Sequence, residues 1–478
     1  MTSEAYQNII EKWTQLPQTS SQQTLDLNLV QAIFLEGLGL SLEQVKVISL
    51  GNGAGLTPDR LIYKELNQPP VLTVELKKRV PELAQADPNN FIETCQNHPL
   101  YRSAVGYLKE SNNDNGIKQY LDVSNEKIDR NRLAHYGWVF NGDFFQLWRR
   151  VDGVIFPLTL IQKVTEENLP QLLDQLAYCI NQPPKGITVA IWNRKGGVGK
   201  TTNTLNIGAT LALNNKKVLM IDLDPQNDLS HGLNINPNQY KGNFQECLKL
   251  IKLQRSGAEI LDSIKEQVIQ KEFSTTSHSN SNSNIQFSVL PIPSDDLDDI
   301  LQNDSNQLYG TRPDKIKLIQ KFIQYINTSF DYIFTDTPPT LNVLSGGSLM
   351  ACDLVLLPCD YSRKTLRHSA DIYNQVIPQV RKKRLNKRTF ITSPWNLGIV
   401  FSNCPSNHSI TLENCVQNEL QIKRFNGKQY ETRLKIYAQT KLAEFKYSPV
   451  ICWPNSYITI LYKQLVNEVF LTQNFIDE

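Results

Sequence analysis

The chain has 478 residues, of which 40% are apolar, and a formal net charge of +2. This length exceeds one typical hydrophobic core, so it predicts two domains with ordinary globular packing. Because the net charge is close to zero, it neither indicates nor excludes binding to nucleic acid. No apolar run approaches the roughly 20 residues that a bilayer span needs, which excludes a transmembrane helix.

Eight cysteines are scattered along the chain, without a C-x-x-C pair or a spacing typical of metal ligands. They predict buried thiols in a reducing compartment. The polar stretch Met1–Gln23 lacks the basic-then-apolar order of a secretion signal. We therefore expect a cytoplasmic protein, associated with the nucleoid if it binds DNA.

The first third of the chain predicts a separate domain at residues 24–180, preceded by a polar tail at residues 1–23. Leu25–Leu40 has apolar residues at helical spacing and ends in a Gly-Leu-Gly stop signal. Gly51–Gly55 predicts a turn or flexible loop between strands. The expected strands are Val45–Leu50, Arg60–Leu66 and Val71–Leu76.

Two carboxylates and a lysine lie near the ends of these strands. Asp59 precedes the second strand, and Glu75 and Lys77 share one face of the third because side chains alternate along a strand. Such a trio can hold a divalent metal and position a water for attack on a phosphodiester. A solvated sheet edge is the alternative, because E-x-K is common on strands.

Pro58-Asp59 together with Glu75-Leu76-Lys77 resembles the PD-(D/E)XK nuclease fold, and specifically the N-terminal nuclease domain of type I restriction motor subunits. The resemblance implies a metal-dependent endonuclease site, with Asp59 and Glu75 binding Mg²⁺ or Mn²⁺ and Lys77 assisting catalysis. A nuclease-like fold that is idle and serves only for binding is the alternative.

Two further features accompany this resemblance. Tyr136–Gly142 and Phe145–Arg150 predict a strand, an Asn-Gly turn and a second strand, and a hairpin of this kind follows the E-x-K strand in that family. Glu36, on the preceding helix, is a weaker site candidate because an acidic residue on an amphipathic helix most often faces solvent. The helical pattern Glu166–Ile180 then ends, and Asn181–Gly186 predicts a linker at residues 181–186.

Residues 187–478 predict the second domain. Its first elements are an apolar run at Ile187–Ile191, a glycine loop ending in Lys200-Thr201, a helical pattern to Leu213, and a second apolar run at Lys217–Asp224. A strand, a phosphate-binding turn and a helix in this order make the first βαβ unit of a nucleotide-binding parallel sheet. Glycines in such a loop let backbone N–H groups approach phosphate oxygens.

The loop departs from the pattern G-x-x-x-x-G-K-[ST], because Arg194 stands in place of the first glycine and Lys195 adds a second lysine. With the runs Asp222–Gln226 and Asp331–Pro339, it resembles the deviant P-loop of the ParA/MinD family of ATPases. The expected fold class is thus α/β: a restriction-endonuclease-like α/β domain followed by a P-loop NTPase parallel sheet with helices on both faces.

This resemblance implies ATP hydrolysis with Mg²⁺ in a homodimer that forms on ATP binding. Lys200 serves its own phosphates, Lys195 crosses to the partner's nucleotide, and Asp224 positions the attacking water. The implied magnesium residues are Thr201, Asp222 and Asp336. The implied nucleotide-binding residues are Lys195, Gly196, Gly197, Val198, Gly199, Lys200, Thr201, Thr202 and Asn403.

The rest of this domain gives weaker signals. Residues 274–284, rich in Ser and Asn, predict a disordered surface loop. The basic run Arg381–Arg384, with Lys387 and Arg388, predicts either contact with DNA phosphates or a solvated helix end. Further buried strands are expected at Phe287–Ile292, Leu354–Pro358 and Leu397–Phe401.

The resemblance does not indicate which molecule or structure the ATPase positions. The tail Val466–Glu478 is lysine-free, unlike the basic amphipathic helix that ends the membrane-binding branch, so nonspecific DNA is the favoured partner and a membrane is not expected. The main hypothesis is a DNA-associated dimeric ATPase that controls a metal-dependent nuclease-like domain, in a mobile-element or defence system.

Two alternatives remain. One is a plasmid or chromosome partition ATPase with an inactive N-terminal adaptor and a partner protein encoded nearby. The other is a regulatory protein that holds ATP without turnover.

Overall fold

The computed structural model describes residues 1–48, 58–106, 116–123, 133–182, 186–275, 284–302, 310–326, 329–385, 391–405 and 409–476. The chain divides into two compact units. We call Met1–Pro184 with Phe390–Thr392 and Phe470–Glu478 the N-terminal unit. Lys185–Thr389 with Ser393–Val469 is the C-terminal unit. The expected glycine turn at Gly51–Gly55 and half of the expected linker at residues 181–186 (183–185) lie outside the described residues.

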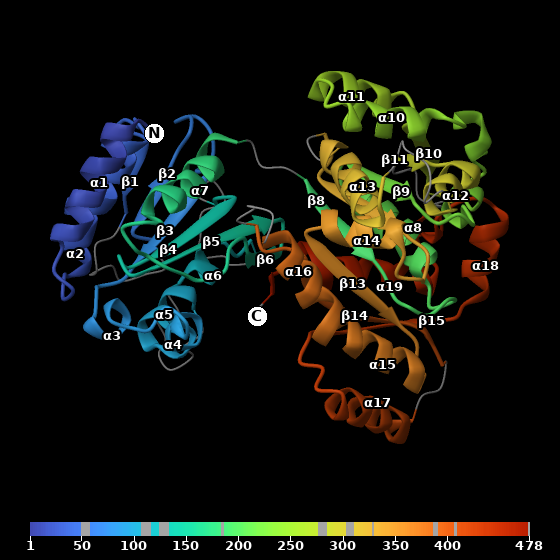
Figure 1. The fold of residues 1–478 in the computed structure, drawn as a ribbon. Helices are drawn as coiled ribbons and strands as arrows, with labels where there is room; N and C mark the ends of the chain where they lie inside the picture. The colour runs from blue at the N-terminus through green and yellow to red at the C-terminus, as the bar shows by residue number, and fades with distance from the viewer. Residues whose placement is uncertain are drawn as a thin grey trace. The chain divides into compact units, whose positions relative to one another are not determined.

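The N-terminal unit is built on a mixed sheet with helices on both faces (Figure 1). Its strand order is β1-β2-β3-β4-β5-β6-β16, and β7 pairs with β5. β3 and β4 are parallel, β16 is parallel to β6, and the other pairs are antiparallel. The strands are β1 Val45–Val47, β2 Arg60–Ile62, β3 Leu72–Leu76, β4 Tyr136–Phe140, β5 Phe144–Val151, β6 Val154–Pro157, β7 Gln162–Lys163 and β16 Asn474–Phe475.

Side-chain alternation fills a core on each face of this sheet. Trp138 packs on one face with Phe34 and Leu172, and Val139 packs on the other with Phe91. The expected helix at Leu25–Leu40 is formed by α2 (Gln22–Leu25) and the π-helical turns Asp26–Val30 and Ile33–Gly37. The other helices are α1 Ser3–Gln15, α3 Pro81–Ala84, α4 Phe91–Asn97, α5 Pro99–Val105, α6 Ile117–Tyr120 and α7 Leu169–Asn181.

The prediction of a polar tail at residues 1–23 is wrong. The Thr2 hydroxyl caps α1 by accepting from the Ala5 N–H, and Ile9 is fully buried in the core. The Trp13 indole donates to the carbonyl of Gly142 at 2.7 Å. A few apolar side chains on one face of α1 therefore suffice to dock it, although its overall composition is polar.

The expected limit of the second domain at residue 478 is also wrong, because Phe470–Glu478 lies with the N-terminal unit. The Gly153 N–H donates to the Phe470 carbonyl, and the Gly153 carbonyl accepts from Asn474, both at 2.8 Å. The Ile476 N–H donates to Ile155 at 2.9 Å, so β16 extends the sheet beyond β6. The C-terminal segment is thus part of the N-terminal fold.

We expect Gly153→Ala to destabilise the N-terminal unit by about 1–3 kcal/mol, the usual cost of overpacking. An added Cβ at Gly153 would lie 2.0 Å from the carbonyl oxygen of Thr472, which is backbone and cannot rotate away. Urea unfolding and proteolysis at the C-terminus measure the effect. Gly257→Ala is the control, because its Cβ would meet the Tyr325 ring at an ordinary 3.6 Å. Equal stabilities of the two variants would contradict the expectation.

The C-terminal unit contains an eight-stranded sheet in the order β10-β11-β9-β12-β8-β13-β14-β15, parallel except for the β10–β11 pair. The α/β fold class with a mostly parallel sheet is confirmed. The strands are β8 Ile187–Ile191, β9 Val218–Asp222, β10 Ile269–Ser274, β11 Asn284–Pro291, β12 Tyr332–Asp336, β13 Leu354–Cys359, β14 Trp395–Cys404 and β15 Gln429–Lys435.

Helices cover both faces of this sheet (Figure 1). α8 (Lys200–Leu213) and α19 (Tyr457–Val466) pack against each other, and α13 (Arg312–Ile326) packs on α14 (Val343–Ala351). The others include α9 Asp228–His231, α10 Asn243–Lys252, α11 Gly257–Lys265, α12 Ser294–Gln302, α15 Arg363–Asp371, α16 Ile377–Leu385, α17 Ile410–Ile422 and α18 Ala438–Phe445. The expected loop at 274–284 begins and ends in strands at Ser274 and Asn284, and residues 276–283 lie outside the described part of the chain.

Candidate nucleotide site and a buried acidic site

The glycine loop between β8 and α8 forms an open cradle at the start of a helix, the kind of place where proteins bind phosphate. Gly197 and Gly199 have φ values of +71° and +87°, which side chains rarely adopt. A Cβ at Gly196 or Gly197 would meet no atom within 4 Å, so the space in front of the loop is open to a ligand. Because α8 begins at Lys200, its first N–H groups face this space.

Lys200 lies at the base of the cradle with only 7% of its surface exposed. Its ammonium donates to the Lys195 carbonyl at 3.4 Å. Burial lowers the pKa of Lys200, and the negative charges of Asp336 and Asp224 act in the opposite direction. Within the described ranges no carboxylate forms an ion pair with this buried ammonium, which suits it to an anionic ligand.

Two parallel strands bring their terminal carboxylates together behind the cradle. Asp222 ends β9, Asp336 ends β12, and the two residues are paired in register. Burial raises the Asp222 pKa to about 7, although Ser230 donates both its hydroxyl, at 2.6 Å, and its N–H to that carboxylate. Burial and the nearby Asp222 raise the Asp336 pKa well above its ordinary value, and Thr201 opposes that rise.

These carboxylates fit a hydrated cation. Both Asp336 carboxylate oxygens are buried, and neither has a hydrogen bond of normal geometry within the described part of the chain. Among the described residues no three acidic, histidine or cysteine side chains are placed to hold a metal directly. Mg²⁺ usually keeps several waters and takes few direct protein ligands, so Thr201, with Asp222 and Asp336 behind it, matches that preference.

The cradle opens into a cavity of about 470 Å³. Asp224 lines it, and the Gln226 N–H donates to that carboxylate at 3.1 Å. Asn403 lines it too, with its amide donating to the Gly197 carbonyl at 2.9 Å. The structure thus brings together the expected glycines, Lys200, Thr201, Thr202, Asp224 and Asn403.

Other cavity residues come from distant segments. Lining residues that the sequence analysis missed include Ser402, Lys435, Tyr437, Thr440, Glu444 and Tyr462. Ser402 could have been found, because it lies near the carboxyl end of a predicted strand, where ligands gather in parallel sheets. The segments around β15, α18 and α19 carry no local motif that indicates a nucleotide site.

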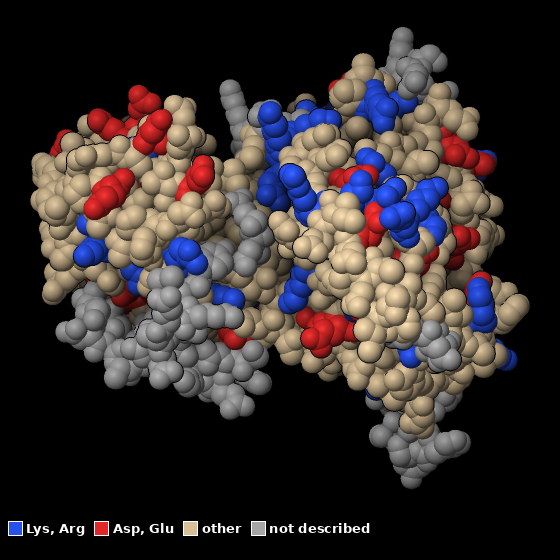
Figure 2. Space-filling model, turned by 90° about the horizontal axis from the view of Figure 1, so that it is seen from below, with Lys and Arg blue, Asp and Glu red and all other residues tan. Residues whose placement is uncertain are grey.

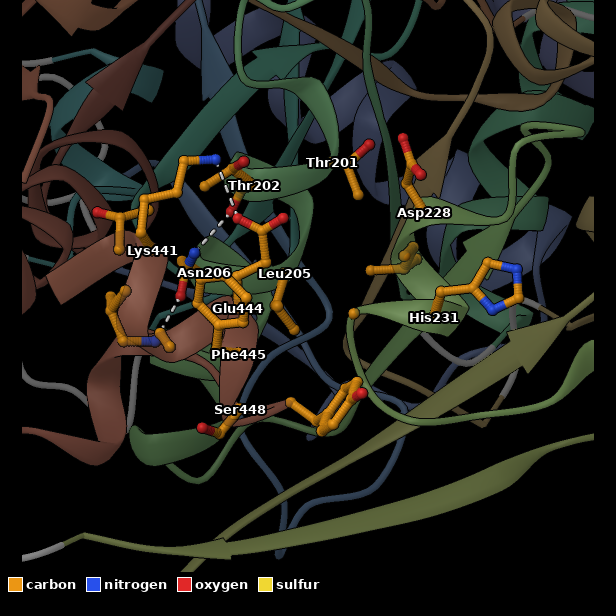
Figure 3. A pocket seen from close by; sticks show the side chains of 16 residues that line it. Thr201, Thr202, Leu205, Asn206, Asp228, His231, Lys441, Glu444, Phe445 and Ser448 are labelled. Carbon is orange, nitrogen blue, oxygen red and sulfur yellow. Dashed lines mark hydrogen bonds and ion pairs between the residues drawn. The ribbon is translucent and has the colours of Figure 1, made fainter. Parts of the chain in front are cut away.

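A second cavity of about 460 Å³ lies along α8 and shares Thr201, Thr202 and Asp228 with the first. Figure 3 shows it between α8, α9 and α18, with His231 and Phe445 on its walls. Lys441 donates to Glu444 at 3.0 Å along α18, on one wall of this cavity. The space around the phosphate loop is therefore wider than the cradle itself.

Lys195 points away from its own cradle. Its ammonium donates to the Asp360 carboxylate at 2.5 Å and to the Ser362 hydroxyl at 3.0 Å. Burial raises the Asp360 pKa, but hydrogen bonds from Lys195, Ser362 and Thr365 outweigh it, so the pKa lies below its ordinary value. Lys195 is thus held by residues at the carboxyl end of β13.

For the basic run Arg381–Arg384, neither contact with DNA phosphates nor a solvated helix end holds for Arg384. Arg384 is buried and donates to the Cys352 carbonyl at 2.6 Å, and the Arg381 guanidinium stacks 3.7 Å over the Trp395 ring. Lys382 and Lys383 are exposed. Lys387 and Arg388 lie outside the described residues.

The N-terminal unit brings Asp59, Glu75 and Lys77 together. Lys77 donates to Glu75 at 2.6 Å, and Asp59 accepts from the N–H of Leu76 at 2.7 Å. Burial, followed by the nearby Glu75, raises the Asp59 pKa to about 8. Burial raises the Glu75 pKa as well, while Lys77 lowers it. This is a buried pair of carboxylates with one ammonium rather than a solvated edge.

Neighbouring side chains complete this site. Gln22 donates to Asp59 at 2.6 Å, and the Tyr120 hydroxyl hydrogen-bonds to Glu75; the sequence analysis missed both, since neither belongs to the E-x-K pattern. Lys78 is exposed, as strand alternation predicts. Glu36 is not part of the site, because it accepts from Asn8 and pairs with Lys12 on the surface.

The glycine cradle, buried lysine and paired carboxylates of the C-terminal unit define a P-loop nucleotide hydrolase. A family model described as an AAA domain matches residues 186–391. The sporulation initiation inhibitor protein Soj of Bacillus subtilis is 27% identical over 285 residues, which cover 59% of this chain and 98% of Soj.

The chromosome partitioning protein ParA of Myxococcus xanthus is 28% identical over 198 residues, 40% of this chain and 60% of that protein. The solved structure of Cyanthece apo McdA matches with a TM-score of 0.42 and 19% identity, over 59% of this chain and 98% of that one.

Residues 186–391 are an ATPase region of the ParA/MinD/Soj type, and the protein hydrolyses ATP. The N-terminal mixed sheet is a separate fold that these matches do not identify. Within the described part of the chain, no helix is both long and apolar enough to cross a membrane.

Proposed function

We propose that the chain is a partition-type positioning ATPase, which dimerises on ATP, associates with DNA without sequence preference, and uses its N-terminal unit as an adaptor. The observation that carries this proposal is the glycine cradle, with its buried lysine and paired carboxylates, in a region similar to Soj and ParA. Slow ATP hydrolysis then limits how long the dimer stays bound to DNA.

The chain's own residues divide the work in this mechanism. The glycine loop and Lys200 bind the phosphates, and Asp224 orients the attacking water. Thr201, Asp222 and Asp336 hold Mg²⁺, which neutralises charge on the phosphates when bound. Lys195 reaches the nucleotide of the second subunit, because Lys200 already occupies the base of its own cradle.

We expect ATP to strengthen DNA binding and the affinity to fall steeply with salt. Each phosphate contact adds about −0.9 to the slope of log K against log salt, and a dimer doubles the contacts. Lys and Arg side chains gather in several groups on the face of the C-terminal unit seen in Figure 2, with Asp and Glu between them. Filter binding at several salt concentrations, with and without an ATP analogue, measures both effects.

The exposed Lys382 and Lys383 give this prediction a residue-level test. Replacing both with alanine should make the salt slope shallower by about two to four if each contacts one phosphate per subunit. Lys249→Ala with Lys265→Ala is the control, because these exposed lysines pair with acids on their own helices. DNA binding that is equally strong with and without the ATP analogue would remove DNA from the proposal. So would a filter assay in which the protein retains no DNA even at low salt.

A second candidate function is metal-dependent cleavage of DNA by the N-terminal unit. The specific observation in its favour is the buried convergence of Asp59, Glu75 and Lys77. In this proposal the two carboxylates hold Mg²⁺ or Mn²⁺ and Lys77 orients the water or stabilises charge on the phosphate. The ATPase would then control a nuclease in a mobile-element or defence system.

A further inference from the structure

The cavity along α8 adjoins another cavity of about 680 Å³, and His231 and Tyr447 line both. We call the two together the α9–α18 groove, because α9 ends at His231 and α18 ends at Phe445. Figure 3 shows the first of these cavities, with His231 and Phe445 on its walls. All the residues that line the groove belong to the C-terminal unit. The groove is therefore formed by one subunit alone.

Aromatic side chains follow the groove and reach the solvent. Phe445 lines the first cavity and is 80% exposed, and Tyr447 lines both cavities and is 50% exposed. Tyr240 lines the second cavity. A single exposed ring on a protein surface is ordinary, but several rings along one groove offer a surface on which unpaired bases stack. Every base has a face for such stacking, so the interaction tolerates any sequence.

The backbone at Tyr447 is unusual for a tyrosine. Its φ is +52°, and it is the only aromatic residue among the described non-glycine residues with positive φ. The Tyr447 N–H donates to the Glu444 carbonyl at 3.1 Å. The Ser448 N–H donates to the Ala443 carbonyl, also at 3.1 Å. These two hydrogen bonds form a Schellman motif, in which glycine usually occupies the place of Tyr447. A strained tyrosine at a glycine position indicates that its ring has a function.

The second cavity also carries polar groups that suit a nucleotide. Within the described part of the chain, its lining contains no carboxylate. Lys271 supplies a positive charge for a phosphate. The side-chain amides of Asn234 and Gln239 line it too, and amides offer both donors and acceptors to the edge of a base. Rings, amides and a cation together match a base with its phosphate.

The first cavity has a different charge balance. Asp228 and Glu444 both line it, and the Glu444 carboxylate accepts from Lys441 at 3.0 Å, which compensates its charge. Asp228 lines the nucleotide cavity as well. The phosphates of a bound strand therefore favour the second cavity, where Lys271 lies, while Phe445 offers its ring to a base in the first.

We propose that the α9–α18 groove binds single-stranded DNA, with unpaired bases stacked on Phe445 and Tyr447 and a phosphate beside Lys271. The inference rests on the proposed function, which places the chain on DNA. A base inside a duplex is stacked on its neighbours, and exposing its face costs unstacking energy, so the groove selects unpaired bases. Because Thr201 and Thr202 also line the first cavity, the groove runs up to the phosphate loop.

Fluorescence anisotropy with a labelled single-stranded oligothymidylate, about 15 nucleotides long, tests the proposal. The full chain is measured with ADP, because the proposed function ties duplex binding to ATP whereas the groove needs only one subunit. Phe445→Ala and Tyr447→Gly should each weaken binding about five- to 150-fold, the usual loss for one stacked base. Tyr457→Ala is the matched control, because Tyr457 is 58% exposed and lines neither cavity.

The backbone at Tyr447 separates a loss of binding from a loss of folding. Tyr447→Ala and Tyr447→Gly both remove the ring, but only glycine adopts the positive φ without strain. The glycine variant should therefore have the higher urea midpoint of the two, and both should bind the oligonucleotide equally weakly. Lys271→Gln should make the slope of log K against log salt shallower by about 0.7, the share of one phosphate on a single strand.

The groove and the proposed function fail in different ways. Wild-type affinity for the oligonucleotide in Tyr447→Gly, or no binding by the wild type, overturns the groove proposal. Tighter binding of an oligouridylate of the same length overturns the assignment to DNA. Duplex retention with an ATP analogue should be equal in Tyr447→Gly and the wild type. A wild type that binds the oligonucleotide but retains no duplex contradicts the proposed function and still supports the groove.

Discussion

Asp224→Ala should bind ATP and form the dimer but turn ATP over about 10²–10⁴-fold more slowly than the wild type. A carboxylate that positions an attacking water or takes its proton typically contributes an effect of this size. Asp224 is suited to the role because it lines the nucleotide cavity, and its negative charge acts on the buried Lys200. Single-turnover measurements with saturating ATP and Mg²⁺ isolate the chemical step.

Asp228→Ala is the matched control for this loss. Asp228 lines the same cavity, is exposed, and also acts on the charge of Lys200. A merely electrostatic role for Asp224 predicts similar losses in both variants, whereas a positioned water predicts a large loss only in Asp224→Ala. Equal turnover in Asp224→Ala and the wild type would refute the assignment.

The second large effect tests the second candidate function, under which Lys77→Ala is expected to abolish DNA cleavage by the N-terminal unit while leaving metal bound. Loss of a group that orients water or stabilises charge on the phosphate costs about 10²–10³-fold or more. Lys78→Ala should cleave like the wild type, because Lys78 is exposed and alternates with Lys77 along the chain. Plasmid cleavage with Mg²⁺ or Mn²⁺, with and without ATP, compares these variants with Asp59→Ala.

Metal binding has a pH signature that does not depend on cleavage. The Asp59 pKa is raised from 3.8 to about 8, so the folded chain holds this proton more tightly than the unfolded chain. Without metal, the stabilising contribution of that proton is present below pH 4 and is lost as pH rises towards 8. A cation needs the charged carboxylate, so it should raise the melting temperature more at pH 8 than at pH 6.

Asp59→Asn should remove both the pH dependence and the gain from metal. Cleavage that survives in Asp59→Ala would indicate another site or a contaminant. No metal-dependent shift and no cleavage by the wild type would leave the adaptor role for the N-terminal unit.

Short patterns in the sequence were enough to locate many residues of the nucleotide site and of the buried acidic site. The glycine loop, Asp222 and Asp336 were found in the sequence because a strand's end and a phosphate-binding turn leave short, ordered signals. The same holds for Glu75 and Lys77, because alternation along a strand fixes which residues share a face. The hairpin at β4 and β5 was also predicted, since its two strands are separated by a turn with an Asn-Gly signal.

The tertiary structure alone decided other features. These are the docking of α1, the return of Asn474–Phe475 to the N-terminal sheet, the burial of Arg384, and the hold of Asp360 on Lys195. By itself the sequence determined the periodic elements and the chemistry at their ends, because those depend on neighbours within a few residues. Which distant segments meet depends on how whole elements pack, and a local pattern carries no information about that.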